Sequence, residues 1–327
     1  MLTNFAKTHI GQRKINEDSI LVDESLGLYI VADGVGGLEK GDVASQIACQ
    51  KVKDCIIKGE TLSHSVYEAH GALVDQIESN HNKQGMATTI VAVLFKDNYY
   101  DISWVGDSRV YLWDDKLKLL TKDDSYVEIL LENGYINVED LETHPDRNII
   151  SQALGMTRKE ITVNHNSGTL ERNQVLLVCS DGLYSIANEI DMINELNLYN
   201  SMMKLTDNLV NIAVKNNGMD NISLVSIKSD ANTHDDSESI NPFILREFDT
   251  KTGKVNDDKV CDTKNQQQTD PELVDQTTLK ELTQYERDLL DSAAQMVPQT
   301  KEKTNYIIPI LLFSIVVVVT IIIFIFR

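Results

Sequence analysis

Short apolar runs separated by polar turns make up most of the first 228 residues. The runs Leu28–Ala32 and Thr88–Phe95 are rich in β-branched side chains, which is typical of buried strands. Residues 100–104 alternate between apolar and polar side chains, the period-two pattern of a half-buried strand. The same reasoning predicts further strands over residues 19–23, 109–113, 118–120, 161–165, 175–180 and 222–227.

Helical periodicity appears between these strands. In residues 42–57, for example, Ala44, Ile47 and Val52 recur on one helical face. Because strands cluster with strands and helices come in pairs, the pattern favours an α+β protein over βαβ units. We therefore expect a four-layer α-β-β-α sandwich of two antiparallel sheets flanked by helix pairs, with residues 133–155 as an irregular surface flap. Helices are also predicted over residues 63–79, 124–132 and 203–214.

The character of the chain changes after residue 229. Residues 230–305 are polar and acidic with few apolar side chains, which predicts a mostly disordered linker. Ile307 to Phe326 carries no charge over twenty residues, the length that crosses a bilayer as a helix. A buried globular helix is the alternative for this last segment. We predict a globular domain over 1–229, a linker over 230–305 and a single C-terminal transmembrane anchor over 306–327.

Charge and cysteine usage narrow the environment of the globular domain. The formal net charge is −20, from 50 acidic and 30 basic residues. This balance argues against nucleic acid as a partner, because phosphate backbones are bound by clustered Lys and Arg. None of the four cysteines forms a C-x-x-C pair, which disfavours a zinc ribbon and fits a reducing compartment. The first thirty residues hold no apolar segment of signal-peptide length, so we expect a cytoplasmic domain tethered to the membrane.

Five short segments combine an acid with Gly, Asn or Ser at the end of a predicted strand. Asp33, Asp107 and Asp181 directly follow apolar runs, and three glycines lie within the four residues after Asp33. Each acid alone is explained equally well as a turn residue. Together they predict convergence on one place, where the repulsion of unpaired carboxylates calls for bound cations. The segments are Asn16-Glu17-Asp18-Ser19, Ala32-Asp33-Gly34, Gly106-Asp107-Ser108, Ser180-Asp181-Gly182 and Asp220-Asn221.

The ligands in these segments are all oxygen atoms, which favours Mg²⁺ or Mn²⁺ over zinc. Two such ions about 3.5–4 Å apart share a bridging carboxylate and a bridging water, and they make hydroxide available near neutral pH. They also neutralise charge on an in-line phosphoryl transition state. Arg13, four residues before Glu17, is a candidate for gripping a substrate phosphate with two parallel hydrogen bonds. A surface arginine in a loop is the alternative.

In their order along residues 1–228, these segments resemble the metal-dependent protein serine/threonine phosphatases of type 2C, above all their compact bacterial members. The linker and the anchor lie outside the resemblance. It implies hydrolysis of phosphoserine and phosphothreonine on proteins by direct attack of a metal-bridging hydroxide, opposing a cognate Ser/Thr kinase at the membrane. The matching pieces are Arg13, Asn16-Glu17-Asp18-Ser19, Val31-Ala32-Asp33-Gly34-Val35-Gly36-Gly37, Gly41, Val43-Ala44-Ser45, Thr88-Thr89, Trp104-Val105-Gly106-Asp107-Ser108-Arg109, Thr121-Lys122-Asp123, Ala153-Leu154-Gly155, Ser180-Asp181-Gly182 and Asp220-Asn221-Ile222-Ser223.

The resemblance also implies a set of ligands for two core metal ions, Mn²⁺ or Mg²⁺. Asp33 would bridge the two ions, and Gly34 would add its backbone carbonyl. Glu17 would bind one ion, directly or through water, while Asp181 and Asp220 would hold the other.

Further roles follow for residues around this core. Asp18 would orient metal-bound water, and Arg13 would clamp the substrate phosphate. Asp123 would help Asp181 hold a third, weaker metal, and the flap over residues 133–155 would shape substrate access. Asp107 is interpreted as structural, fixing a turn.

Two other functions stay open at this stage. A non-catalytic phosphatase-fold module that only binds a regulator would be favoured by loss of an essential carboxylate, but all of them are present. A membrane scaffold whose acidic linker recruits partners is separated from the enzyme by deleting residues 230–327. One departure from the resemblance affects the chemistry: Val35 stands where many eukaryotic relatives carry a histidine proposed as general acid.

Overall fold

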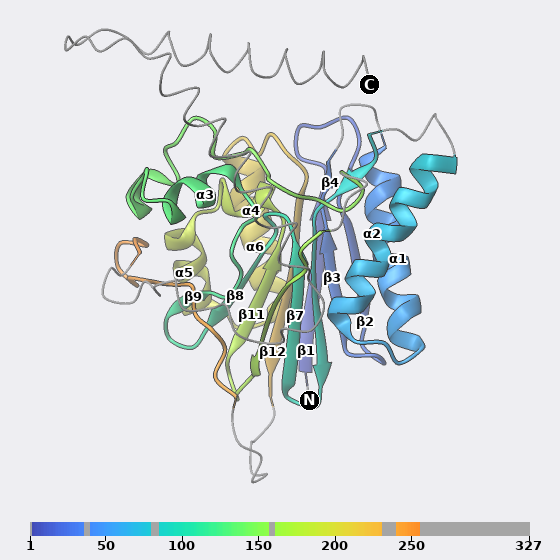
Figure 1. Ribbon diagram of the computed structural model, residues 1–327. Coiled ribbons are helices and arrows are strands. Elements are labelled where there is room, and N and C mark those ends of the chain that lie inside the picture. Colours follow the sequence, from blue (N-terminus) through green and yellow to red (C-terminus); the bar gives the residue numbers. More distant parts are fainter. Residues whose placement is uncertain (1, 36–39, 80–84, 157–160, 231–239, 256–327) are drawn as a thin grey trace, which may run out of the picture. The chain divides into compact units, whose positions relative to one another are not determined.

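Figure 1 shows the fold in a computed structural model that describes residues 2–35, 40–79, 85–156, 161–230 and 240–255. Two antiparallel sheets form the centre of this part of the chain. The six-stranded sheet has the order β1 (Leu2–His9), β12 (Ile222–Ser229), β11 (Val175–Cys179), β8 (Arg109–Trp113), β9 (Leu117–Leu119) and β13 (Arg246–Phe248). The five-stranded sheet has the order β10 (Asn164–Thr169), β7 (Tyr99–Val105), β6 (Ile90–Lys96), β3 (Leu28–Ala32) and β2 (Ser19–Asp23).

The two sheets pack face to face and bury apolar side chains between them. Val31 and Val91 of the five-stranded sheet share one buried cluster with Val178 and Val225 of the six-stranded sheet. Alternate residues of β3 point to opposite faces, so Ile30 packs into a second cluster on the outer side. Because both faces of β3 are covered, all five of its residues are buried, which explains the uninterrupted apolar run in the sequence.

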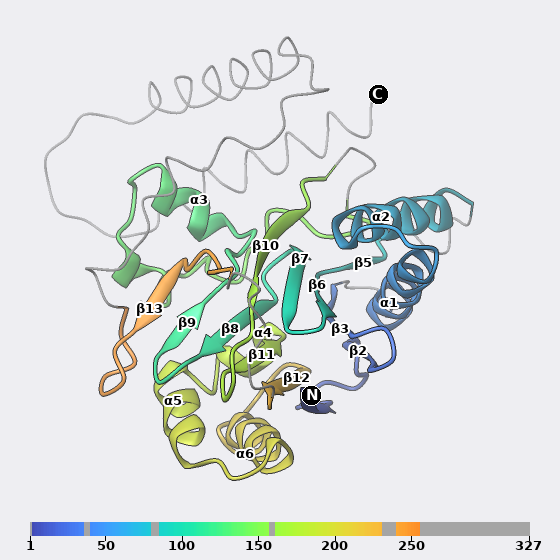
Figure 2. The same ribbon diagram turned by 90° about the horizontal axis from the view of Figure 1, so that it is seen from below.

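Helices cover the outer face of each sheet, as the views in Figures 1 and 2 show. Val52 and Leu73 on one helix pair pack with Ile30 on the five-stranded sheet. Leu209 on the other side packs with Leu224 of the six-stranded sheet. The predicted four-layer α-β-β-α sandwich is thereby confirmed. The helices are α1 (Gly41–Ile57), α2 (Leu62–Ser79), α3 (Tyr126–Glu132), α4 (Asp181–Tyr184), α5 (Glu189–Leu198) and α6 (Met202–Lys215).

Two predicted strands have different limits in the structure. The strand predicted over 161–165 begins later, as β10, whose sequence is polar throughout. Buried Asn166 in β10 donates to the carbonyl oxygens of Leu120 and Phe243, at 2.8 Å each. This strand therefore depends on pairing with β7 and on a satisfied amide, which an apolar pattern does not reveal. The strand predicted over 88–95 is split into β5 (Ala87–Thr88) and β6.

Residues 240–255 pack against the domain, although the sequence placed them in the linker that begins at residue 230. Their strand β13 pairs with β9 and extends the six-stranded sheet, so the fold continues beyond residue 229. The surface flap predicted over 133–155 is irregular apart from a short 3₁₀ turn, Val138–Asp140. The predicted anchor over 306–327 lies outside the described residues. Within the described residues, no helix is long and apolar enough to cross a bilayer.

Candidate active site

Asp33 lies at the break between β3 and the two-residue strand β4 (Gly34–Val35). The Thr89 amide and the Thr88 hydroxyl both donate to the Asp33 carbonyl oxygen, at 2.8 Å each. The Asp33 amide in turn donates to the Thr89 hydroxyl at 3.3 Å. This threonine pair fixes the backbone where β3 ends. The Asp33 side chain lines a cavity of about 390 Å³ together with Arg13, Glu17, Gly34, Val35, Thr89, Asp107, Asn148, Ile150, Asp181 and Asp220.

Gly34 allows an unusually close approach of three backbone segments. A Cβ atom at this position would lie 2.3 Å from the Gly41 carbonyl carbon and 2.6 Å from the Glu17 carbonyl oxygen. A Cβ atom on Gly41 would lie 2.7 Å from the Gly34 carbonyl oxygen and 2.6 Å from Glu17 Oε1. The Gly34 carbonyl and the Glu17 carboxylate are therefore neighbours beside the first residue of α1.

Asn221 positions Glu17 although it lies about two hundred residues later in the sequence. The Glu17 amide donates to Asn221 Oδ1 at 2.8 Å. The Asn221 side-chain amide donates to the carbonyl oxygens of Ile10 at 2.9 Å and Ile15 at 3.1 Å. The Glu17 carboxylate itself accepts from the Gly41 amide at 2.9 Å. Asn221 was part of a sequence motif, but its positioning role was not predicted, because it depends on contacts across the fold.

Asp181 and Asp220 reach the same cavity from the ends of neighbouring strands. Asp181 follows β11 and begins α4, and its carboxyl group lies within hydrogen-bonding reach of Asp33. Asp220 precedes β12, and its Oδ2 accepts from Arg13 Nη2 at 2.7 Å. The structure therefore brings Arg13 to the site, but it pairs the guanidinium with a candidate ligand. The Arg13 side chain is 53% exposed, so its remaining donors face the open cavity.

Asp18 lies behind this group, almost fully buried. Its Oδ2 accepts from the Ser180 hydroxyl at 2.9 Å, whereas its Oδ1 has no hydrogen-bond partner among the described residues. Burial raises the pKa of Asp18 to about 7, and the charges of Asp181 and Asp220 add to this shift. Protein groups alone therefore leave part of this carboxylate unsatisfied.

Burial and like charges also raise the pKa values of the carboxyl groups at the centre of the site, Asp33 and Asp181. Burial, followed by the charges of Asp18 and Asp181, raises the pKa of Asp33 well above its ordinary value. Burial and the charge of Asp220 also raise the pKa of Asp181, whose buried Oδ1 has no hydrogen-bond partner among the described residues. Unpartnered oxygens and carboxylates in mutual repulsion are the conditions that a bound cation relieves. The donor set, all oxygen, fits Mn²⁺ or Mg²⁺.

The carboxylates are spread across the cavity rather than gathered at one point. Within the described residues, no three acidic, histidine or cysteine side chains lie close enough to enclose an ion by themselves. The predicted set differs from such a cage, because it divides its side chains between two ions and takes one oxygen from the Gly34 backbone. Two ions that also keep water ligands need fewer side chains each.

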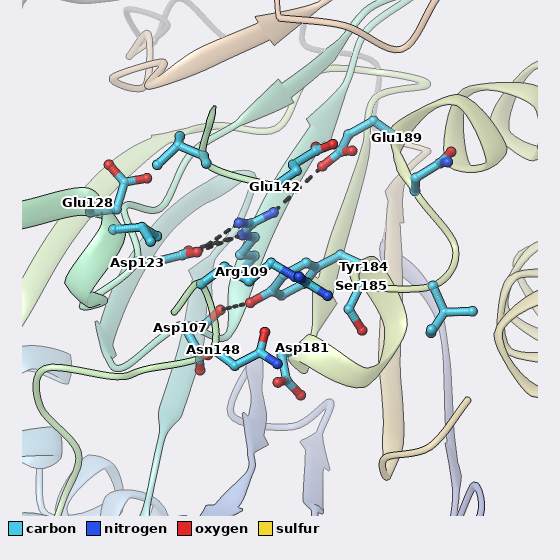
Figure 3. A pocket seen from close by; sticks show the side chains of 15 residues that line it. Asp107, Arg109, Asp123, Glu128, Glu142, Asn148, Asp181, Tyr184, Ser185 and Glu189 are labelled. Atoms are coloured by element: carbon cyan, nitrogen blue, oxygen red, sulfur yellow. Dashed lines mark hydrogen bonds and ion pairs between the residues drawn. The ribbon is translucent and has the colours of Figure 1, made fainter. Parts of the chain in front are cut away.

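Asp107 and Asp123 both share a cavity with Asp181, but their surroundings differ. Asp107 lines the cavity with Asp33, and burial followed by the charge of Asp181 raises its pKa well above the ordinary value. Asp123 lies in an adjoining cavity, where Arg109 binds both of its oxygens through contacts of 2.8 to 3.2 Å (Figure 3). Asp107, which the sequence grouped with the converging acids but which was interpreted as structural, thus lines the candidate site. A strand-end acid in a Gly-Asp-Ser turn gives no sequence signal that separates a structural turn residue from a residue of the site.

Comparisons with known proteins agree with this geometry. The sequence profile named Protein phosphatase 2C matches residues 6–224. The serine/threonine phosphatase stp of Listeria monocytogenes is 34% identical over 232 residues, covering 67% of this chain and 92% of the relative. The structure of the serine/threonine phosphatase Stp1 from Staphylococcus aureus has a TM-score of 0.65 at 27% identity, covering 71% of this chain and 96% of that one.

A second solved structure bears on the metal content. It is the catalytic domain of the serine/threonine protein phosphatase PstP in complex with two manganese ions. Its TM-score is 0.61 at 29% identity, and the match covers 69% of this chain and 97% of that chain. The chain described here is therefore a protein serine/threonine phosphatase and belongs to the protein phosphatase 2C family.

Proposed function

We propose that this phosphatase hydrolyses phosphoserine and phosphothreonine on proteins in a single displacement, with two core divalent ions and no covalent enzyme intermediate. The observation that supports this most strongly is the meeting of Glu17, Asp33, Asp181 and Asp220 in one cavity, although the first and last lie more than two hundred residues apart. With the Gly34 carbonyl, these residues would hold the ions. When bound, Mn²⁺ or Mg²⁺ supplies hydroxide near neutral pH and neutralises charge on the phosphoryl group.

The residues around the ions have separate tasks in this reaction. Asp18, held by the Ser180 hydroxyl, accepts a hydrogen bond from the attacking water and so orients it. Arg13 turns its free donors to the substrate phosphate while one remains on Asp220. As the new phosphorus–oxygen bond forms, the bond to the serine or threonine oxygen breaks. None of the described residues that line the cavity is a histidine, so the leaving alkoxide takes its proton from solvent water.

Asp107 is the residue we propose beside Asp181 for any third, weaker ion, in place of Asp123. Asp107 shares both cavities with Asp181, and burial followed by the charge of Asp181 raises the pKa of Asp107. The oxygens of Asp123 are already bound by Arg109. An ion at Asp123 would have to displace a guanidinium that is buried with it.

The central test is hydrolysis of a soluble phosphopeptide by the full chain, with Mn²⁺ or with a chelator. Asp33→Asn should lower kcat/KM at least about a hundredfold, because it removes several kcal/mol of transition-state stabilisation. Asp54→Asn, on the exposed side of α1, is the matched control and should behave as wild type. Activity that persists in chelator, or an Asp33→Asn variant within twofold of wild type, would contradict the mechanism. An inactive wild type with Mn²⁺ would instead support a non-catalytic module.

We further propose that residues 306–327 tether the catalytic domain to the cytoplasmic face of a membrane, near a Ser/Thr kinase whose products it hydrolyses. The support is the uncharged run from Ile307 to Phe326. The full chain should remain with membranes after an alkaline wash, whereas a chain that ends at Val255 should be released. The shortened chain should retain its activity on a soluble phosphopeptide. Loss of that activity would favour the scaffold function, and release of the full chain would contradict the anchor.

A further inference from the structure

Residues 240–255, which we name the C-terminal strap, lie beyond the part of the chain that matches the family profile. They nevertheless belong to the core of the domain. The three residues of β13 are buried, and the Leu245 amide donates to the Leu119 carbonyl oxygen at 2.9 Å. Leu245 and Phe248 join the buried cluster under α5 and α6. The strap is therefore fixed to the sheet that carries Asp181 at the end of β11.

Arg246 forms the most deeply buried ion pair of the strap. Its guanidinium donates to Glu128 on α3, and each of the two side chains is only 5% exposed. A buried ion pair is strongly destabilised when one partner is removed, because the other charge is left dry and unpaired. The position of Glu128, and with it the position of α3, is therefore tied to β13.

The start of α3 is also where the flap returns to the body of the domain. The Tyr126 amide donates to the Ile149 carbonyl oxygen at 2.8 Å, and the Ser151 amide donates to the Asp124 carbonyl oxygen at 2.7 Å. These bonds hold the end of the flap against α3. The two flap residues that line the active-site cavity, Asn148 and Ile150, lie directly beside these bonds. A movement of α3 would therefore be transmitted to the wall of the active site.

A second contact joins the strap to the same region. The Phe248 ring packs against the Tyr111 ring, with 6.2 Å between their centres. The Tyr111 hydroxyl accepts from Arg109 at 2.9 Å and donates to Glu189 at 3.0 Å. Figure 3 shows Arg109 between Glu189 and Asp123. The strap thus supports both α3 and the buried charge cluster beside it.

We propose that the C-terminal strap positions the flap for phosphoprotein binding, and that Arg246 is the positioning residue through its ion pair with Glu128. No residue of the strap is among the described residues that line the cavity of the candidate metal ligands. Its loss should therefore leave the chemistry on a small phosphate ester intact, because such a substrate needs only the metal cavity. Binding of a phosphopeptide should weaken, because the polypeptide around the phosphate has to contact the flap.

The test compares two substrates in the full chain with Mn²⁺. Arg246→Met should raise KM for a phosphopeptide by about twofold to thirtyfold, the range expected for coupling through a packed network. Its kcat/KM for p-nitrophenyl phosphate should stay within twofold of wild type. Arg246→Lys keeps the charge without the planar fork, so its phosphopeptide KM should fall between the two. Should Arg246→Met fail to fold, Arg246→Lys carries the test. Amide hydrogen exchange of residues 148–151 should then be faster in Arg246→Lys than in wild type.

Two control variants separate positioning from general loss of stability. Lys116→Met removes an ion pair between Glu247, which neighbours Arg246 on β13, and Lys116, just before β9; this pair does not involve α3. Leu209→Ala weakens the core under α6 and should lower Tm at least as much as Arg246→Met. Both controls should keep the wild-type phosphopeptide KM. The proposal is overturned if Arg246→Met lowers Tm with no change in that KM, or if it impairs both substrates equally.

Discussion

Alanine at position 34 is expected to disrupt the active site through the backbone rather than through any lost side chain. Its Cβ would lie 2.3 and 2.4 Å from the carbonyl carbon and oxygen of Gly41, and 2.6 Å from the carbonyl oxygen of Glu17. All three are backbone atoms, so no rotamer change relieves the contact. Either β4 or the start of α1 has to move. The first carries the Gly34 carbonyl proposed to bind an ion, and the second holds the Glu17 carboxylate through the Gly41 amide.

The size of the effect follows from these contacts. Overpacking of this kind costs about 1–3 kcal/mol. For a domain of this size, each kcal/mol lowers Tm by about 2–4 °C, so Gly34→Ala should lose about 2–12 °C. Displacing supports of metal ligands typically costs about tenfold to a hundredfold in metal affinity, and we expect the Mn²⁺ dissociation constant of Gly34→Ala to rise by that factor.

The assay combines Tm measured with a chelator, Mn²⁺ binding by calorimetry, and phosphopeptide hydrolysis at saturating Mn²⁺. Gly71→Ala is the matched control, because a Cβ at this position on α2 meets no atom within 4 Å. It should raise stability by about 0.5–1 kcal/mol through helix propensity and leave Mn²⁺ affinity unchanged. A Gly34→Ala variant with wild-type Tm and wild-type Mn²⁺ affinity would refute the reasoning, because it would show that the neighbouring backbone yields at no cost.

Three further predictions concern single side chains of the site. The raised folded pKa of Asp18, about 7 against 3.8, means that its contribution to stability is complete below about pH 4 and is lost as pH rises through 7. Urea unfolding with a chelator should show this loss, roughly 1–4 kcal/mol, in wild type, and Asp18→Asn should lack it. Arg13→Met should lower phosphopeptide kcat/KM by about tenfold to a hundredfold. It should change the free energy of unfolding by less than about 1 kcal/mol, because the ion pair of Arg13 is exposed. An unchanged kcat/KM would show that Arg13 does not bind the phosphate. Asp123→Asn should lose about 3–5 kcal/mol of stability, because it leaves buried Arg109 short of a partner, whereas Asp107→Asn should keep or raise Tm and alter the dependence on metal concentration. The reverse pattern in these two variants would restore Asp123 as the ligand.

The parts of the fold that the sequence predicted are those in which burial follows a local pattern. β3 has both faces covered, so its limits were readable from an apolar run. β10 was misplaced, because its polar residues are satisfied by bonds to distant carbonyl groups. β13 was assigned to the linker, because three residues give no periodicity and its partner β9 lies more than a hundred residues earlier.

The candidate site shows the same division. Acids that directly follow apolar runs marked Asp33 and Asp181, and both do line one cavity. The two acids Asp107 and Asp123 differ because Arg109 binds the oxygens of Asp123. The Arg109 guanidinium also stacks on Tyr184, with 3.7 Å between its central carbon and the ring centre. No spacing in the chain encodes that contact. Sequence patterns thus indicated which acids converge, while the tertiary structure shows which cavity each carboxylate lines.

The pairing of β1 has a consequence for how the chain is made. β1 is the first described strand, yet it lies at the edge of its sheet. Among the described residues its only strand partner is β12, with Leu2 opposite Ser229. Its backbone donors and acceptors therefore stay unpaired until more than two hundred residues have left the ribosome. The hydrogen bond from the Glu17 amide to Asn221 likewise forms only after residue 221 has been synthesised. A nascent or prematurely terminated chain should thus have an open strand edge and no phosphatase activity, and assembly of the active site should be one of the last steps of folding.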